Sequence, residues 1–186
     1  MSIQIQSMST VQSTIHQQFV TQLEQHAGIV LKVARTYCWH RDDRAELEQE
    51  IVMHVWRAYR KYDQAKSFST WLYRIALNVA ISHVRKQATR NRHFVAYDES
   101  IHEASDLDTP FDDDPRIEML QRFMTTLEPL NRAVLLLYFE EHTDAEIANI
   151  VGIPETNVAS KVSRLKQRIR TFSAAQEQRG PDRGTG

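Results

Sequence analysis

The most informative segment of the chain is TDAEIANIVGIPETNVASKVSRLKQRIR, residues 143–170. It opens with a capping box, in which the Thr143 hydroxyl accepts from the backbone of Glu146 while the Glu146 carboxylate reaches back. Gly152 ends this first short helix, because glycine adopts the left-handed conformation that lets the chain turn. Pro154 then favours the start of a second helix. The stretch therefore predicts a helix-turn-helix.

The second helix of this motif has an apolar side and a polar, basic side. Its apolar residues are spaced four, three and four apart, which places them in one narrow seam. The opposite side has the character of a helix that enters the major groove of DNA. The residues that we predict to contact phosphates or base edges are Thr156, Asn157, Ser160, Lys161, Ser163, Arg164, Gln167 and Arg168. A generic pair of helices with a charged surface is the alternative interpretation.

The composition of the whole chain favours helices. Its 186 residues are 41% hydrophobic and include 5 Gly and 5 Pro, fewer than turn-rich β proteins usually need. Apolar residues at helical spacing predict further helices over residues 19–37, 47–59, 68–87, 117–127 and 130–141. We therefore expect an all-α protein made of two small helical domains.

Charge alternates along the chain, although the formal net charge is only −1. Residues 57–93 hold nine basic residues and one acidic residue, whereas residues 98–118 hold nine acidic residues and one basic residue. Residues 155–170 are basic again. Two basic blocks around an acidic one indicate two nucleic-acid-binding modules joined by a linker, with ordinary solvated helix faces as the alternative.

These patterns divide the chain into five segments. We expect residues 1–14 and 174–186 to be disordered, and residues 94–115 to form an acidic linker. The first module then spans residues 15–93, and the second module spans residues 116–173.

Aromatic and basic residues alternate within the first module. Such a pattern is typical of proteins that bind single-stranded nucleic acid, because bases stack on rings while cations follow the phosphates. We expect the core to include Trp56, Phe68, Trp71 and Leu72. The candidates for contact with a strand are Tyr59, Tyr62, Tyr73, the loop 63–67 and, on the following helix, Asn78, Ser82, His83, Arg85 and Lys86.

Two blocks of motifs resemble the extracytoplasmic-function (ECF) sigma factors of the sigma-70 family. Residues 46–57, together with FSTWLYRIALN at residues 68–78, are similar to the second conserved region of these proteins. Residues 127–137 and the helix-turn-helix are similar to the fourth region. The sequence departs from the family pattern at Glu48, where an apolar residue is usual, and at Pro154, where Ser or Thr is usual.

The resemblance implies an alternative sigma factor that binds core RNA polymerase and directs promoter recognition, promoter melting and transcription initiation. Its implied partners are the clamp coiled coil of the largest polymerase subunit, the flap of the second-largest subunit, promoter DNA and an anti-sigma factor. The residues that match the docking surface or its support are Leu47, Gln49, Glu50, Val52 and Trp56. The residues that match the elements reading and melting the −10 element are Tyr62, Lys66, Ser67, Phe68, Arg74, Asn78, Ser82, Arg85 and Lys86. The recognition helix, 155–170, matches the reader of the −35 element.

Other classes of protein find little support in the sequence. It contains no nucleotide-binding glycine loop, catalytic serine motif or zinc-binding histidine motif, so we expect no enzyme activity, no cofactor and no metal. The single cysteine, Cys38, excludes an internal disulfide. Without a long apolar segment we expect no membrane insertion, and a cytoplasmic protein that joins the nucleoid when bound to polymerase. A conventional helix-turn-helix regulator that acts without polymerase is the alternative function, although it would not need the features of the first module.

Overall fold

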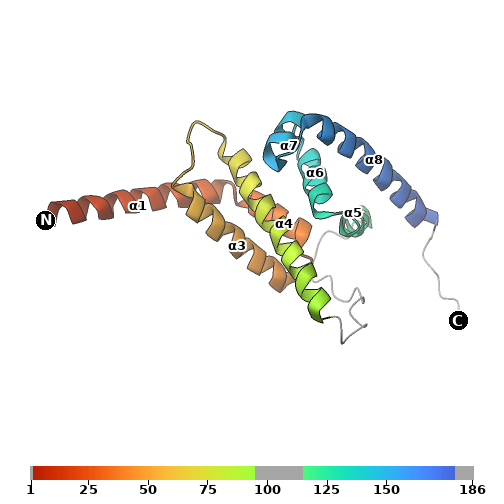
Figure 1. Cartoon of the computed structure of the whole chain (residues 1–186), viewed down its shortest axis with the longest axis horizontal. Coiled ribbons are helices and arrows are strands. Elements are labelled where there is room, and N and C mark those ends of the chain that lie inside the picture. Colours follow the sequence, from red (N-terminus) through yellow and green to blue (C-terminus); the bar gives the residue numbers. More distant parts are fainter. Residues whose placement is uncertain (1, 95–114, 179–186) are drawn as a thin grey trace.

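The computed structural model describes residues 2–94 and 115–178, and within these ranges the chain forms helices and no strand. The helices are α1 (Ser2–Gln25), α2 (Ala27–Tyr37), α3 (Arg41–Tyr59), α4 (Phe68–Phe94), α5 (Pro115–Thr125), α6 (Pro129–Phe139), α7 (Asp144–Val151) and α8 (Glu155–Gln178). Figure 1 shows α2–α4 gathered in one group and α5–α8 in another, with the N-terminal part of α1 extending away from both. The predicted all-α fold with two helical domains is confirmed.

The first module is built on the mutual packing of α2, α3 and α4. Their apolar residues recur every three or four positions, so each helix turns one side inward. Side chains with no exposed surface come from all three helices and include Val33, Leu47, Ile51, Val55 and Leu72. Burying such a side chain stabilises the fold by about 1.5–3 kcal/mol. Helix α1 joins this core through Phe19, whose ring packs against Trp56 and Tyr59.

Helix α1 starts earlier than predicted. The sequence predicts disorder over residues 1–14, whereas α1 begins at Ser2. This segment contains no Gly or Pro that would stop a helix, and it continues a helix that Phe19 anchors to the core. The single helix predicted for the next part of the chain is instead divided at His26, whose Nδ1 is 2.8 Å from the backbone oxygen of Gln22.

Two other helices run further than predicted. Helix α4 continues past residue 87 to Phe94, and α8 continues to Gln178 through the first residues of the tail that we expected to be disordered. Neither extension contains a Gly or Pro. The predicted acidic linker over residues 94–115 lies outside the described residues except for its two ends, as does the rest of the tail over residues 179–186.

The second module packs α6, α7 and α8 against one another, with α5 against α8. Its deeply buried apolar side chains come from four helices and include Phe123, Val134, Leu135, Leu137, Ile147 and Val158. The rings of Phe123 and Phe172 pack at 5.4 Å and join α5 to the C-terminal half of α8. Helices α5 and α6 therefore pack against the helix-turn-helix that α7 and α8 form.

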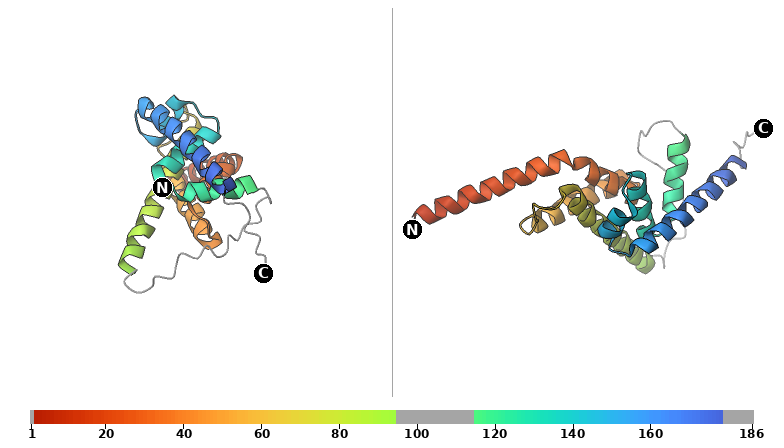
Figure 2. Two further views of the ribbon diagram at one scale, coloured as in Figure 1. Left: turned by 90° about the vertical axis from the view of Figure 1, so that its right-hand side faces the viewer. Right: turned by 90° about the horizontal axis from the view of Figure 1, so that it is seen from above.

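The two modules are in contact. Helix α4 contacts α6 and α7, and α2 contacts α6, as the views in Figures 1 and 2 also show. The Tyr37 hydroxyl donates to the backbone oxygen of Pro129 at 2.6 Å. The carboxylate of Glu140 pairs with Lys32 and accepts from the Tyr73 hydroxyl at 3.3 Å. Specific polar contacts therefore hold the modules together in this structure.

Candidate nucleic-acid interface

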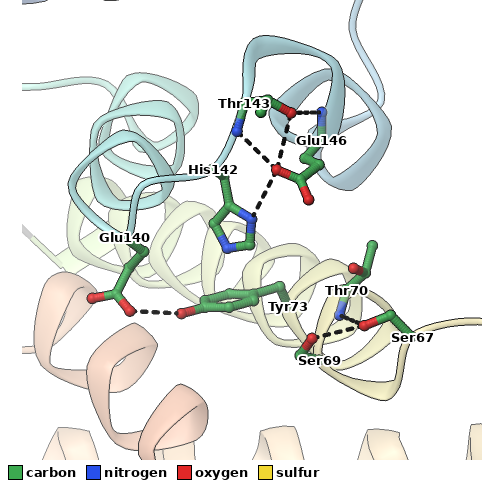
Figure 3. A network of polar contacts seen from close by, with 8 residues as sticks. All are labelled: Ser67, Ser69, Thr70, Tyr73, Glu140, His142, Thr143 and Glu146. Atoms are coloured by element: carbon green, nitrogen blue, oxygen red, sulfur yellow. Dashed lines mark hydrogen bonds and ion pairs between the residues drawn. The ribbon is translucent and has the colours of Figure 1, made fainter.

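The helix-turn-helix forms as predicted, and local contacts fix its start and its turn. The backbone N–H of Glu146 donates to the Thr143 hydroxyl at 3.3 Å, and the Thr143 N–H donates to the Glu146 carboxylate at 2.8 Å (Figure 3). These hydrogen bonds favour the charged form and hold the pKa of Glu146 below its ordinary value. Gly152 has a φ of 77°, in the left-handed region where side chains are disfavoured.

Helix α8 turns its apolar seam inward and its polar side outward. The seam residues Val158, Val162 and Leu165 are buried. The predicted DNA-binding residues that lie exposed are Thr156, Asn157, Ser160, Ser163, Arg164, Gln167 and Arg168. Lys161 differs from them, because its side chain is partly buried and its ammonium group donates to Asn131 of α6 at 2.9 Å. The structure therefore brings seven of the eight predicted residues to one outward side.

Helix α4 carries a second exposed polar stripe. It consists of Arg74, Asn78, Ser82 and Arg85, which are spaced four, four and three residues apart and lie on one side of the helix. Lys86 is exposed beside this stripe. His83, also a candidate in the sequence, is buried, and its Nδ1 lies 2.9 Å from the Glu50 carboxylate. His83 therefore joins α4 to α3 and does not face a strand.

The division of the aromatic residues into buried and exposed side chains differs from the prediction. Tyr59 and Tyr73, which we expected to be contact candidates, are only 8% and 4% exposed. Trp56, expected in the core, is 37% exposed, while Phe68 is buried as expected and Trp71 is half-buried. Residue type and spacing predicted that this part of the chain is rich in aromatic residues, but not which of the rings are buried. Their burial depends on how the loop between α3 and α4 places the two helices.

The loop 60–67 joins α3 to α4 and holds the remaining candidates of the first module. The Tyr62 ring stacks against Tyr59 and packs at 4.7 Å from the Trp71 ring. Its hydroxyl donates to the backbone oxygen of Lys66, which closes the loop on itself. Burial and the nearby charge of an acidic residue raise the pKa of the Tyr62 phenol, so it remains a hydrogen-bond donor.

The start of α4 is held by hydroxyl groups. The Thr70 N–H donates to the Ser67 hydroxyl at 3.4 Å, and the Ser67 and Ser69 hydroxyls are 2.8 Å apart (Figure 3). The Ser67 hydroxyl therefore caps the start of this helix. The exposed Lys66 lies directly before Ser67 in the loop, and its ammonium group is 4.0 Å from the Asp63 carboxylate.

The residues predicted to dock on polymerase lie along α3. Leu47 is fully buried and can only support such a surface. Gln49 and Val52 line an apolar groove of about 490 Å³ between α3 and the preceding helices. The groove also exposes two large apolar side chains that sequence analysis missed, Leu31 at 40% and Met53 at 50%. Both residues are apolar and stand on helix sides that are otherwise polar, and this pattern in the sequence could have identified them as part of a binding surface.

Glu50 is bound within its own module. Its carboxylate pairs with His83 at 2.9 Å and with the Lys86 ammonium at 3.7 Å. Burial disfavours the charged carboxylate, but the hydrogen bond from His83 and the charges of Lys86 and His54 outweigh it, so the pKa of Glu50 is lowered. Glu50 therefore ties α3 to α4 and is less available to a partner than Gln49.

Cys38 has no features of a reactive site. Its thiol is buried, and burial, together with the charge of Asp43, raises its pKa to about 11. A thiol with a raised pKa stays protonated and is a weak nucleophile. Within the described residues, no cluster of three or more His, Cys, Asp or Glu side chains is arranged to hold a metal ion. None of the described helices has the length and apolarity that crossing a membrane requires.

Comparisons with known protein families match both modules. A model of Sigma-70 region 2 matches residues 23–90, and a model of Sigma-70, region 4 matches residues 117–169. The chain is 28% identical over 139 residues to an ECF RNA polymerase sigma-E factor of Haemophilus influenzae, covering 69% of this chain and 74% of that protein. It is also 28% identical over 155 residues to the ECF RNA polymerase sigma factor SigE of Mycolicibacterium smegmatis, covering 82% of this chain and 60% of that protein.

Solved structures share the arrangement of helices. The sigma factor RpoE from Bartonella quintana, in complex with the anti-sigma factor NepR, matches with a TM-score of 0.67 over 84% of this chain and 97% of that chain. CnrH in complex with the cytosolic domain of CnrY matches with a TM-score of 0.63 over 86% of this chain and 90% of that chain. Each is 18% identical to this chain, so the two structures establish the fold.

Proposed function

Because the chain belongs to the sigma-70 family and is an ECF sigma factor that directs transcription initiation, we propose that its two modules read separate promoter elements. The first module binds and opens the −10 element, and the second module reads the −35 element as duplex DNA. The observation that carries this division is the pair of exposed polar and basic stripes, one on α4 and one on α8. The alternative, a regulator that acts without polymerase, is not favoured, because it gives no role to the first module.

In the second module, α8 enters the major groove with the side opposite its apolar seam. Arg164 and Arg168 are exposed there and have the guanidinium fork that pairs with guanine edges or phosphates. Thr156 and Asn157 lie in the first turn of α8, where backbone N–H groups and the helix dipole favour a phosphate. Lys161 instead positions α8 against α6 through Asn131.

In the first module, a separated DNA strand follows the α4 stripe toward the loop 60–67. Arg74 and Arg85 neutralise phosphates, and Asn78 between them offers an amide that can bond a base edge. The rings of Tyr62 and its neighbours offer a surface on which an unpaired base can stack, a contact worth about 1–3 kcal/mol. Phe68 supports these rings from within the core.

The polymerase binds mainly to the apolar groove beside α3. Gln49, Val52 and Met53 line it, and Trp56, which is 37% exposed, lies about one turn further along the same helix. We assign this surface to the clamp coiled coil of the largest polymerase subunit, and a surface of the second module to the flap of the second-largest subunit. An anti-sigma factor is a further proposed partner, supported by the anti-sigma complexes of the similar proteins RpoE and CnrH.

The chain acts in this proposal as a regulatory subunit and catalyses no reaction of its own. The chemistry of RNA synthesis belongs to the polymerase, while this protein supplies binding energy for promoter DNA. We place it in the cytoplasm, and on the nucleoid when it is bound to polymerase.

Run-off transcription tests the proposed function. Fragmented genomic DNA from the source organism is transcribed by sigma-free core polymerase with and without the full-length protein. Transcripts that need the protein and share upstream elements would support the proposal. Specific duplex binding without polymerase, combined with no new transcripts, would overturn it in favour of a conventional regulator.

A further inference from the structure

One carboxylate connects the docking side of the first module to its DNA-binding side. Glu50 lies on α3 directly after Gln49, which lines the apolar groove, and α3 packs against α4. One carboxylate oxygen of Glu50 is 2.9 Å from Nδ1 of His83, and the other is 3.7 Å from Nζ of Lys86. His83 and Lys86 are three positions apart on α4, so both approach Glu50 from the same side of that helix.

His83 holds the Glu50 carboxylate in place. The side chain of His83 is only 4% exposed, and that of Glu50 is 24% exposed, so packing restricts the movement of both groups. The lowered pKa of Glu50 keeps its carboxylate ionised at neutral pH. Glu50 therefore presents its second oxygen to Lys86 as a positioned anion.

Lys86 differs in this respect from the arginines of the α4 stripe. Among the residues that the structure describes, no acidic side chain pairs with Arg74 or Arg85. The Lys86 side chain is 64% exposed and so accessible to DNA, yet its ammonium group faces the Glu50 carboxylate. A cation that binds a DNA phosphate must give up its other ionic contacts. For Lys86 the competing anion belongs to the protein itself.

We propose that Glu50 competes with promoter phosphates for Lys86, and that His83 positions Glu50 for this role. The inference rests on the proposed −10 function of the first module and adds to it a residue that limits the strength of DNA binding. The carboxylate and a phosphate bind the same ammonium group, so each weakens the contact of the other. Glu50, which the sequence resemblance assigns to polymerase docking, thus also acts on DNA binding as a positioning residue.

The salt dependence of DNA binding tests this competition. Full-length protein is assembled with core polymerase, and the complex is purified by gel filtration. It is then titrated with a fluorescein-labelled oligothymidine strand at several KCl concentrations, with core polymerase alone as the baseline. Glu50→Gln should raise the affinity about 2- to 5-fold, the range expected for a partly exposed ion pair. It should also steepen the slope of log affinity against log salt by up to about 0.7, the value for one phosphate contact on a single strand.

Glu46→Gln is the matched control, because it removes the same charge from an exposed position one turn earlier on α3. It should leave the affinity and the salt slope close to the wild-type values, which separates the release of Lys86 from a general change in net charge. Circular dichroism should show equal helix content in both variants. Damage to the fold would lower the affinity and would not steepen the salt slope.

Lys86→Gln is a second test, made at an exposed side chain that α3 does not need for its packing. It should weaken binding less than Arg85→Gln does, because the Lys86 ammonium is already engaged by Glu50. Combined with Glu50→Gln, it should remove the gain in affinity that Glu50→Gln produces alone.

Two results would overturn the inference. One is that Glu50→Gln changes the affinity and the slope no more than Glu46→Gln does. The other is that Lys86→Gln weakens binding at least as much as Arg85→Gln does. If the wild-type and variant complexes all bind the strand no more tightly than core polymerase alone, the proposed −10 function is overturned, and the inference fails with it.

Discussion

The hydroxyl group of Tyr37 donates a 2.6 Å hydrogen bond to the backbone oxygen of Pro129, and this bond joins α2 of the first module to the first turn of α6 in the second. The phenol is 4% exposed, and the Arg132 guanidinium lies 6.0 Å from the centre of its ring. Burial raises the pKa of Tyr37 against the opposing charge of Arg132, so the phenol keeps its proton. The contact between the modules therefore includes a donor that does not ionise at physiological pH.

Removal of this hydroxyl should loosen the contact between the modules. Tyr37→Phe keeps the ring but leaves the Pro129 oxygen without its donor, which should lower the free energy of unfolding by about 1 kcal/mol. Urea unfolding followed by circular dichroism measures the change. Tyr138→Phe is the control, since it should keep the contact between its ring and Lys166. Equal effects of the two variants would show that the Tyr37 hydroxyl is not specifically stabilising.

Arg164 should contribute to reading the −35 element. Arg164→Ala should reduce transcription from promoters with an intact −35 element by about 10-fold, because a bidentate contact is lost, while core polymerase binding stays the same. Arg41→Ala is the control, since it removes the same side chain from an exposed position of α3, outside the residues assigned to DNA. Loss of polymerase binding in Arg164→Ala to the same extent as transcription would contradict the assignment.

Asn78 should act on the −10 element after or during strand separation. Asn78→Ala should slow promoter opening or change the preferred −10 bases, because the amide in the middle of the α4 stripe is lost. Permanganate reactivity of unpaired thymines measures opening. A template with a pre-opened −10 bubble should restore activity if the defect lies in melting. Unchanged opening and unchanged base preference would remove Asn78 from the interface.

The groove beside α3 should bind core polymerase. Met53 is half exposed in this groove, and Met53→Glu would place a charge on an apolar contact surface. The affinity for core polymerase should fall at least about 5-fold, as expected for a central apolar contact. His54→Glu introduces the same charge at an exposed neighbour that does not line the groove. If both variants bind core polymerase equally well, the docking surface lies elsewhere.

The Glu50–His83 pair should make stability depend on pH. The pKa of Glu50 is lowered in the folded protein, so its contribution is present above the ordinary carboxyl pKa and is lost as pH falls through the lowered value. Glu50→Gln should therefore destabilise the protein more at pH 7 than in acid. Urea unfolding at several pH values measures this difference. Glu46→Gln, at an exposed position of the same helix, is the control. A constant difference between wild type and Glu50→Gln across pH would contradict the role of the pair.

Much of the second module could be predicted from the sequence. The capping box joins residues three positions apart, and Gly152 supplies a backbone conformation that glycine adopts without a neighbour's help. The first module was less predictable. Trp56 and Tyr59 stand three positions apart on α3, and the sequence could not show that Trp56 would be exposed and Tyr59 buried. Their burial depends on where α1 and the loop 60–67 pack.

Contacts within a few residues specify most of the helices, the helix-turn-helix and the polar sides of α4 and α8, so these features could be predicted without a structure. Contacts between residues far apart in the chain could be found only in the folded structure. His83 pairs with Glu50 from 33 residues away, and Tyr37 reaches Pro129 from 92 residues away. The polar pocket lined by Gln18, Gln22 and Tyr62 likewise joins α1 to a loop about forty residues further along the chain. Helical periodicity specifies which side of a helix is apolar, but it contains no information about which other helix will cover that side.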